Sequence, residues 1–184
     1  MSNTLCFGYK GEVKVQYSKN GKVFEFKRHN EGFSFLFKTI ASLLAGEGFP
    51  YGSLSYISLE RVRTDSSSTP STETTKVLFK STTIPITQKP KSIAVEDGDG
   101  NVAYACSVNT TIAYSDMVDK DSGENNWIVS SETINDKAYL YLLSANNTKL
   151  ARVELSPDSV NSISPGVQLF IQWNLIVNNA QSSQ

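Results

Sequence analysis

The chain has 184 residues and a formal net charge of −1 at pH 7, and its composition is 39% hydrophobic and 10% aromatic. This composition is typical of a folded chain, and the length suits one domain, residues 1–184, that buries a sizeable core of its own. The near-zero charge argues against nucleic acid as a main partner, because proteins that bind it carry a basic surface.

The sequence shows no signal for secretion or for membrane insertion. Its first ten residues hold no basic region followed by an apolar run, so they predict no signal peptide. No stretch approaches the roughly 20 apolar residues of a membrane-spanning helix. Cys6 and Cys106 are too few for a disulfide framework, and we interpret them as idle thiols in a reducing compartment. We therefore expect a protein that is made in the cytoplasm and has no membrane partner.

The first predicted element is a hairpin. Residues 12–17 alternate between polar and apolar side chains, and residues 22–27 do the same on the return. Between them, Asn20 and Gly21 suit the positive φ angles of a type I′ turn. The apolar face of the first strand consists of Val13, Val15 and Tyr17.

The only predicted helix covers about residues 33–45. Its apolar side chains recur at the i, i+3, i+4, i+7 spacing of one buried face. Asn30 is the predicted N-cap, and Gly46 stands where a C′ glycine ends a helix. The predicted buried face consists of Phe33, Leu36, Phe37, Ile40, Leu43 and Leu44.

A predicted strand at residues 56–62 leads into a polar stretch at 64–75. Nine of the twelve residues in that stretch are Ser or Thr. It has almost no apolar side chain to bury, so we predict an exposed, mobile loop. The strand pattern resumes over residues 76–87, where Pro85 limits pairing because proline cannot donate to a sheet ladder.

The second half of the chain alternates short strand patterns with polar turns. The expected elements, in chain order, are a hairpin over 92–96 and 101–108, a short strand at 112–114, an exposed loop at 115–126, a short strand at 127–129, and a hairpin over 137–143 and 149–155.

The last predicted strand, residues 167–177, is the most apolar one. It places Phe170 and Ile176 on the side opposite its main apolar face, and apolar side chains on both sides indicate a central position in a sheet. The tail at 178–184 is uncharged and rich in amides, so we expect it to be flexible. The main apolar face consists of Leu169, Ile171, Trp173, Leu175 and Val177.

Many short strands with turn signals between them and a single helix define the expected fold class. We predict a mostly-β domain, an antiparallel β-sandwich or jelly-roll-like fold with one packed α-helix at about residues 33–45. No repeat of regular period is present in the sequence, which argues against a propeller or a solenoid.

His29 is the only histidine, so an enzyme of the Ser-His-Asp or Cys-His type would need it as the general base. It lies between an alternating strand and the predicted helix, a position typical of a polar residue at a corner. We predict no catalytic residues and no enzyme activity.

Two groups of acidic residues fall in predicted turns. A pair of carboxylates supports hydrolysis when an apolar setting raises the pKa of one of them, and these turns predict no such setting. We interpret both groups as solvated acids and predict no metal and no cofactor. Oxygen ligands for calcium within residues 116–124 remain an open alternative, although the EF-hand spacing is not met. The first group is Glu96, Asp97 and Asp99, and the second is Asp116, Asp119, Asp121 and Glu124.

Aromatic side chains raise a second functional class, because sugar rings stack on aromatic faces. We interpret most of these side chains as core residues, with Tyr51 as the exception because it lies in a turn rich in Gly and Pro. A carbohydrate-binding or adhesive β-sandwich is therefore the alternative function. The candidate aromatic residues are Tyr51, Tyr56, Tyr104, Tyr114 and Trp127.

Several segments together resemble small structural proteins of tailed bacteriophage virions, of the kind found in tails, necks and capsid decorations. The resemblance spans most of the chain outside the Ser/Thr-rich stretch, and its motifs describe core and turns instead of an active site. The segments that carry it are residues 28–32, 37–46, 56–59, 84–87, 138–143, 150–155 and 167–178.

This resemblance implies a virion protein that assembles in multiple copies, as a tail or neck ring component or as a capsid-attached protein. Its partners would be copies of itself, in a homo-oligomer, and other virion structural proteins, and its location would be the virion after synthesis in the host bacterial cytoplasm. Loops 64–75 and 115–126 and both termini would then be arms that order against neighbours, and uncovered strand edges would pair with adjacent subunits.

Overall fold

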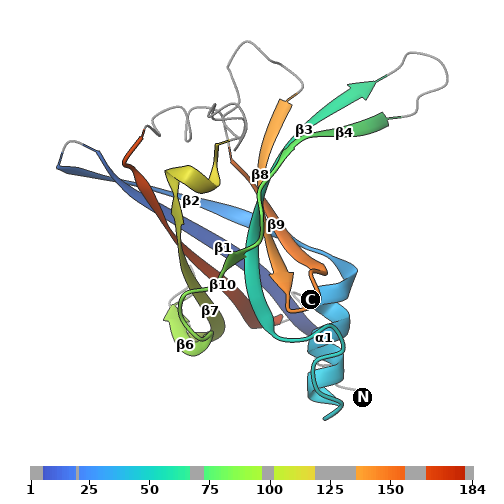
Figure 1. Cartoon of the computed structure of the whole chain (residues 1–184). Coiled ribbons are helices and arrows are strands. Elements are labelled where there is room, and N and C mark those ends of the chain that lie inside the picture. The colour runs from blue at the N-terminus through green and yellow to red at the C-terminus, as the bar shows by residue number, and fades with distance from the viewer. Residues whose placement is uncertain are drawn as a thin grey trace.

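The computed structural model describes residues 6–19, 21–66, 73–96, 102–118, 136–155 and 165–180. Within these ranges only the backbone is described at residues 6–10, 19, 64–66, 73–74 and 177–180. The elements are β1 (Cys6–Lys19), β2 (Lys22–Gly32), α1 (Ser34–Leu44), β3 (Leu54–Ser66), β4 (Glu73–Lys80), β5 (Ile84–Pro85), β6 (Lys91–Glu96), β7 (Val102–Ala113), the 3-10 turn η1 (Tyr114–Asp116), β8 (Asp136–Ser144), β9 (Lys149–Leu155) and β10 (Gln168–Ala180) (Figure 1).

The strands form two antiparallel sheets that pack as a sandwich, so the predicted fold class is confirmed. Sheet A has the order β2-β1-β10-β7-β6, and sheet B has the order β4-β3-β8-β9-β2, with β5 also paired to β3. Strand β2 belongs to both sheets, because it pairs with β1 along most of its length and then with β9 at Glu31 and Gly32. A single hydrogen-bonded path therefore runs from β4 to β6.

The core lies between the two sheets and takes side chains from both. Val13 and Val15 of β1 are fully buried, as the alternation predicts, and Trp173 of β10 is also fully buried. Strand β10 lies between β1 and β7, which confirms its predicted central position. From sheet B the core receives Leu59 of β3 and Leu140 of β8, among others.

The three predicted hairpins are present. Strands β1 and β2 pair antiparallel as predicted but extend further than predicted, and β6–β7 and β8–β9 pair antiparallel as expected. Asn147 adopts a φ of 58° in the turn between β8 and β9. The predicted strand at 112–114 is the end of β7 instead of a separate element, and the predicted strand at 127–129 lies outside the described residues.

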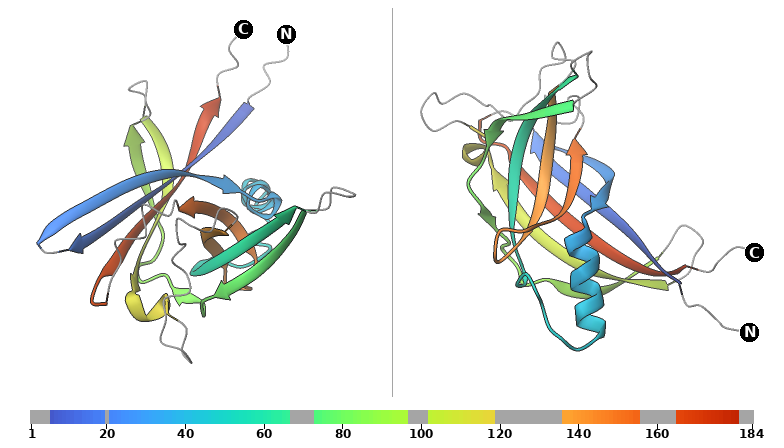
Figure 2. Two further views of the ribbon diagram at one scale, coloured as in Figure 1. Left: turned by 90° about the horizontal axis from the view of Figure 1, so that it is seen from above. Right: turned by 90° about the vertical axis from the view of Figure 1, so that its right-hand side faces the viewer.

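Several predicted boundaries need correction. The loop predicted at 64–75 is shorter, because β3 and β4 pair from Arg63 out to Ser66 and Glu73. Threonine favours strands, so its abundance extends this hairpin; residues 67–72 lie outside the described part of the chain. The loop predicted at 115–126 begins with η1, and its remainder from 119 is likewise not described. The tail predicted to be flexible at 178–184 continues β10 as far as Ala180, which pairs with Cys6, so the two described ends of the chain lie side by side (Figure 2).

Candidate functional site

The helix α1 ends as predicted but begins differently. Gly46 has a φ of +75°, its N–H donates to the carbonyl of Leu43 at 3.1 Å, and the N–H of Glu47 donates to the carbonyl of Ser42 at 2.8 Å. These two bonds form a Schellman motif. The predicted N-cap, Asn30, is wrong: it lies within β2, because the chain stays extended through Gly32 to pair with β9, and Phe33 takes the N-cap position.

The buried face of α1 also differs from the prediction. The residues that it buries are Leu36, Thr39 and Ser42, and Ile40 is half-buried against the core. The small polar side chains let the helix approach the sandwich closely along β9 and β2. Because the contact follows this stripe, Phe37 and Leu44 on the other side of the helix stay exposed. In Figure 2 α1 lies along the outside of the sandwich.

Several exposed apolar side chains lie on α1 and the turn after it, and we call this group of residues the helix face. Leu44 is 72% exposed and Phe49 is 52% exposed. Of the eleven large hydrophobic residues that are exposed among the described residues, five belong to this one segment. Contiguous exposed apolar patches are typical of interaction surfaces, whereas single exposed hydrophobic residues are not. The helix face consists of Phe35, Phe37, Leu43, Leu44 and Phe49.

The helix face is held in a fixed position. The N–H of Phe33 donates to the carbonyl of Leu150 in β9 at 2.8 Å, and its ring stacks on Tyr141 with centroids 6.3 Å apart. On the exposed side, Phe35 meets Tyr51 edge-on at 5.2 Å, and Lys38 Nζ lies 5.7 Å above the same ring. Tyr51, predicted to be the exposed aromatic residue, is half-buried at this border.

The two sheets also have two open strand edges. Strands β4 and β6 are the two ends of the hydrogen-bonded path. Within the described part of the chain, neither has a strand partner on its outer side, so each presents a row of backbone donors and acceptors. Open edges of this kind accept a strand from another chain.

The candidate catalytic and metal-ligating residues that the structure describes lie on different elements. His29 is exposed on β2 opposite Glu12 of β1, inside a strand and not at the predicted corner, and no described residue hydrogen-bonds its ring. Asp116 accepts a hydrogen bond from the N–H of Ala113 at 2.9 Å and so closes the η1 turn. Glu96 is exposed at the end of β6. The other predicted acids, Asp97, Asp99, Asp119, Asp121 and Glu124, lie outside the described residues.

No group of three or more His, Cys, Asp or Glu side chains in the described ranges could hold a metal ion. Cys106 is a half-buried free thiol, and burial raises its pKa. Among the described helices, none is long and apolar enough to cross a membrane.

The candidate aromatic residues occupy separate settings. Tyr56 packs on the outer side of sheet B, Tyr114 packs against the core, and Tyr104 is 66% exposed on β7. Trp127 lies outside the described residues. The candidate aromatic residues that the structure describes therefore do not form one sugar-binding face.

The outer side of sheet B carries a charged network that the sequence did not indicate. The buried carboxylate of Asp136 accepts hydrogen bonds from Arg63 Nε at 2.7 Å and Arg61 Nε at 3.0 Å. The buried carboxylate of Glu60 lies 2.7 Å from Lys149 Nζ, which stands 3.9 Å above the ring of Tyr141. These pairs come from strands far apart in the sequence, so only the sheet register reveals them.

Comparison of the chain with protein-family models, with curated proteins and with solved structures found no match in any of the three.

Proposed function

We propose that the protein is a structural component of a tailed bacteriophage virion and assembles in multiple copies, as a tail or neck ring component or as a capsid-attached protein. The resemblance of its core and turn segments supports the virion class. Its β-sandwich with a single helix is consistent with a protein that works by shape and contact.

The observation that carries the proposal is the helix face. Residues Leu43 and Leu44, with the phenylalanines around them, are exposed although the helix carries smaller polar residues on its buried side. If nothing covered the helix, the fold would be more stable with the apolar side chains on its buried side and the polar ones outside, because burial of apolar surface stabilises a fold. We infer that a second copy of the chain covers this face.

The strand edges supply a second route to assembly. Strands β4 and β6 are different edges at opposite ends of one path. Pairing of β4 from one copy with β6 from the next is a head-to-tail contact, and such contacts close into rings when the rotation between copies allows it.

The oligomeric state tests the proposal. In analytical ultracentrifugation of the full chain over a range of concentrations, we expect a reversible or stable oligomer. Leu44→Ser should raise the dissociation constant at least about tenfold, as loss of a central interface side chain does. Val23→Ser is the matched control, because Val23 is 70% exposed but lies at the start of β2, which is neither part of α1 nor an edge strand, and it should leave association unchanged.

A wild-type chain that stays monomeric at every concentration would contradict self-assembly. The virion class has its own test: antibodies raised against the protein should label tailed particles in electron micrographs of phage lysates. Particles that remain unlabelled, while the antibody detects free protein in the same lysate, would contradict that class.

A further inference from the structure

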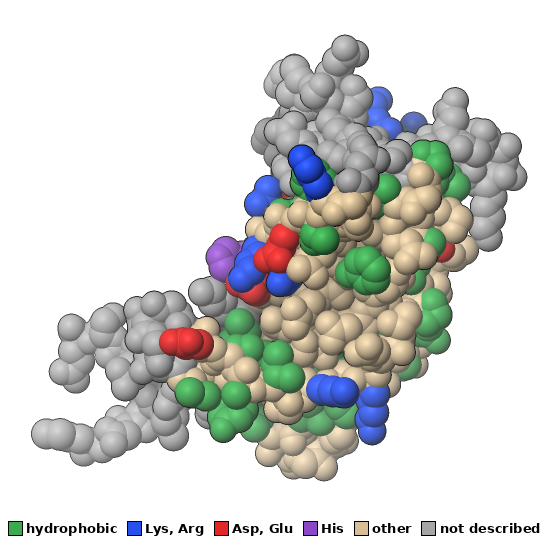
Figure 3. Space-filling model, turned by 90° about the vertical axis from the view of Figure 1, so that its left-hand side faces the viewer, with side chains coloured by type: hydrophobic (Ala, Val, Ile, Leu, Met, Phe, Trp, Pro, Cys, Tyr) green, Lys and Arg blue, Asp and Glu red, His purple; other side chains and the backbone are tan. Residues whose placement is uncertain are grey.

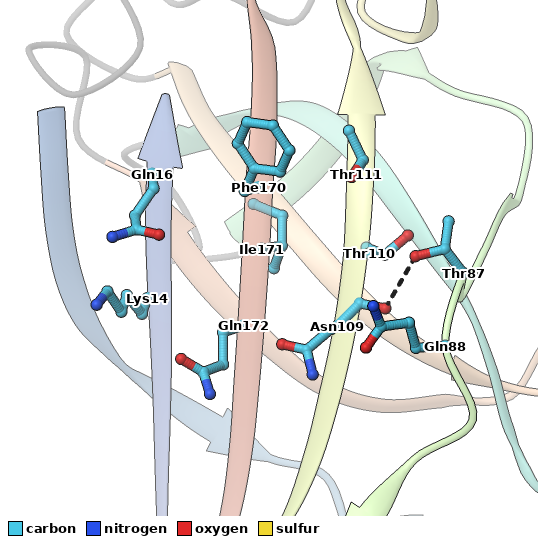
Figure 4. A pocket seen from close by; sticks show the side chains of 10 residues that line it. All are labelled: Lys14, Gln16, Thr87, Gln88, Asn109, Thr110, Thr111, Phe170, Ile171 and Gln172. Carbon is cyan, nitrogen blue, oxygen red and sulfur yellow. Dashed lines mark hydrogen bonds between the residues drawn. The ribbon is translucent and has the colours of Figure 1, made fainter. Parts of the chain in front are cut away.

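The outer face of sheet A carries a depression that the assembly proposal does not use. Its volume is about 350 Å³, and side chains of β1, β10 and β7 form its floor (Figure 4). The strand register arranges these side chains in two rows across the sheet. One row is Lys14, Gln172 and Asn109, and the next is Gln16, Phe170 and Thr111.

The wall of the depression exists because β6 is short. Strand β6 pairs with β7 only as far as Lys91 opposite Ser107. Beyond that point the segment after β5 crosses the edge of β7, held by a hydrogen bond from Thr110 Oγ1 to the carbonyl of Pro85 at 2.9 Å. Thr87 Oγ1 also donates to the carbonyl of Asn109 at 3.3 Å, which places Gln88 beside the row of amides (Figure 4).

Three side-chain amides of the depression make no hydrogen bond to another described residue. Among the described residues, none hydrogen-bonds to the side-chain amide of Gln88, Asn109 or Gln172. Each amide offers two N–H donors and a carbonyl acceptor. A sugar hydroxyl both donates and accepts, so a row of amides matches adjacent hydroxyls of a sugar ring.

Phe170 adds an apolar surface next to these amides. It is 50% exposed, whereas its neighbours Leu169 and Ile171 point into the core. In Figure 4 its ring lies alongside the polar side chains of the depression. An exposed aromatic ring contributes large contact area and a negative π face, to which the C–H groups of a sugar ring are attracted.

The charge of the depression favours a neutral ligand. Lys14 is the one charged side chain among the described residues that line it; its Nζ lies 2.9 Å from Glu25 Oε2, and Gln16 Nε2 donates to the same oxygen at 2.7 Å. The positive charge is therefore balanced within the protein. Figure 3 shows the face that points left in Figure 1, where polar uncharged side chains and backbone make up most of the described surface and charged side chains form separate groups.

We propose that this depression is a binding site for a neutral saccharide. Three amides would hydrogen-bond its hydroxyls, and the ring of Phe170 would stack on one of its faces. The volume lies at the lower end of ligand sites, roughly 300–1,000 Å³, which suits a mono- or disaccharide unit of a longer glycan. The site would give the protein a saccharide-binding activity that does not depend on its assembly.

The test is a titration of the full chain, labelled with ¹⁵N, with glucose, galactose, mannose, N-acetylglucosamine, lactose, maltose, cellobiose and chitobiose, each to about 10 mM, since weak sugar binding has millimolar dissociation constants. Inorganic phosphate and N-acetylneuraminic acid serve as charged probes. We expect at least one neutral sugar to shift the amide signals of Asn109 and Gln172 in a saturable manner, and neither charged probe to do so.

Side-chain variants make the test specific. Phe170→Ala and Gln172→Ala should each weaken binding of that sugar at least about tenfold. Phe24→Ala is the matched control, because Phe24 is a 42% exposed phenylalanine of β2 that belongs neither to the depression nor to the helix face, and it should bind as the wild type does. Circular dichroism of each variant checks that the fold is intact, and Gln172→Ala stands as the second variant if Phe170→Ala is not folded.

Three results would overturn the proposal. They are the absence of saturable shifts with every neutral sugar, shifts that map away from the depression, and unchanged binding in folded Phe170→Ala and Gln172→Ala variants. Binding of phosphate in preference to all the sugars would overturn it as well.

Discussion

Gly11 lies buried in β1, directly opposite Asn30 of β2. A Cβ atom at position 11 would overlap the side-chain amide of Asn30. Gly11→Ala therefore forces that amide out of its place, and we expect it to lower the free energy of unfolding by about 1–3 kcal/mol, as overpacking does. Urea unfolding of the two proteins measures the difference.

A double-mutant cycle gives this prediction its control. Asn30→Ala removes the overlapping atoms, so Gly11→Ala should cost much less in that background than in the wild type. Equal costs in both backgrounds would show that the overlap with Asn30 is not the cause.

Asp136 is buried between two arginines, and this arrangement makes stability depend on pH. The hydrogen bond from Arg63 first, and that from Arg61, hold the pKa of Asp136 below its ordinary value, although burial opposes them. A lowered pKa in the folded state stabilises the protein above the unfolded value, about 3.9, and this contribution is lost as the pH falls through the folded value.

We therefore expect Asp136→Asn to cost about 2 kcal/mol of unfolding free energy at pH 7, as loss of hydrogen bonds to a charged group does. The difference between wild type and variant should shrink as the pH falls below about 3.9. Denaturant unfolding at a series of pH values measures it. A difference that stays constant down to pH 2 would refute the role of the ionised carboxylate.

At the scale of elements, the end of α1 carries a specific backbone requirement. Gly46 adopts a φ of +75°, in the left-handed region that other residues avoid. Gly46→Ala should lower the free energy of unfolding by about 1 kcal/mol. Glu47→Ala is the control, because Glu47 contributes its backbone N–H to the motif while its side chain is exposed. Equal stability of Gly46→Ala and wild type would argue against the motif.

The sequence predicts the helices and strands of this fold better than it predicts what each of them packs against. Alternation in residues 12–17 and the Asn20-Gly21 turn identify the first hairpin because these signals are local. The apolar stripe of α1 is also local, but the sequence does not say what covers it: among the described residues the sandwich buries Leu36 and half-buries Ile40, while Leu43 and Leu44 stay exposed. If a second copy covers Leu43 and Leu44, the predicted buried face is an interface between subunits.

The depression on sheet A was not predictable from the sequence. It brings together Lys14, Asn109 and Gln172, which only the register of three strands places in one row. One local signal was present: Phe170 lies on the side of β10 opposite the main apolar face. That position indicated a central strand, which the structure confirms; the outer side of this strand is exposed at Phe170, half-buried at Ile176 and buried at Asn174.

At the scale of the whole molecule, the two proposed surfaces lie on different parts of the sandwich. The helix face is attached along β9 and β2, while the depression lies on the outer side of β1, β10 and β7. A second copy that covers the helix face would therefore leave the depression open to its ligand. Strand β2, shared by both sheets, makes the sandwich one hydrogen-bonded unit around one core.

Because both sheets share this core, we predict that they unfold together as one domain. Leu140 of sheet B and Trp173 of sheet A are both fully buried in it. Leu140→Ala should lower the free energy of unfolding by about 2–5 kcal/mol. Circular dichroism, which reports on all strands, and the fluorescence of Trp173 should show the same shifted urea midpoint. Trp127→Phe, used as the background for both proteins, leaves Trp173 as the only tryptophan. A midpoint of Trp173 fluorescence that does not move with Leu140→Ala would mean that the sheets unfold independently and that the chain is not one cooperative domain.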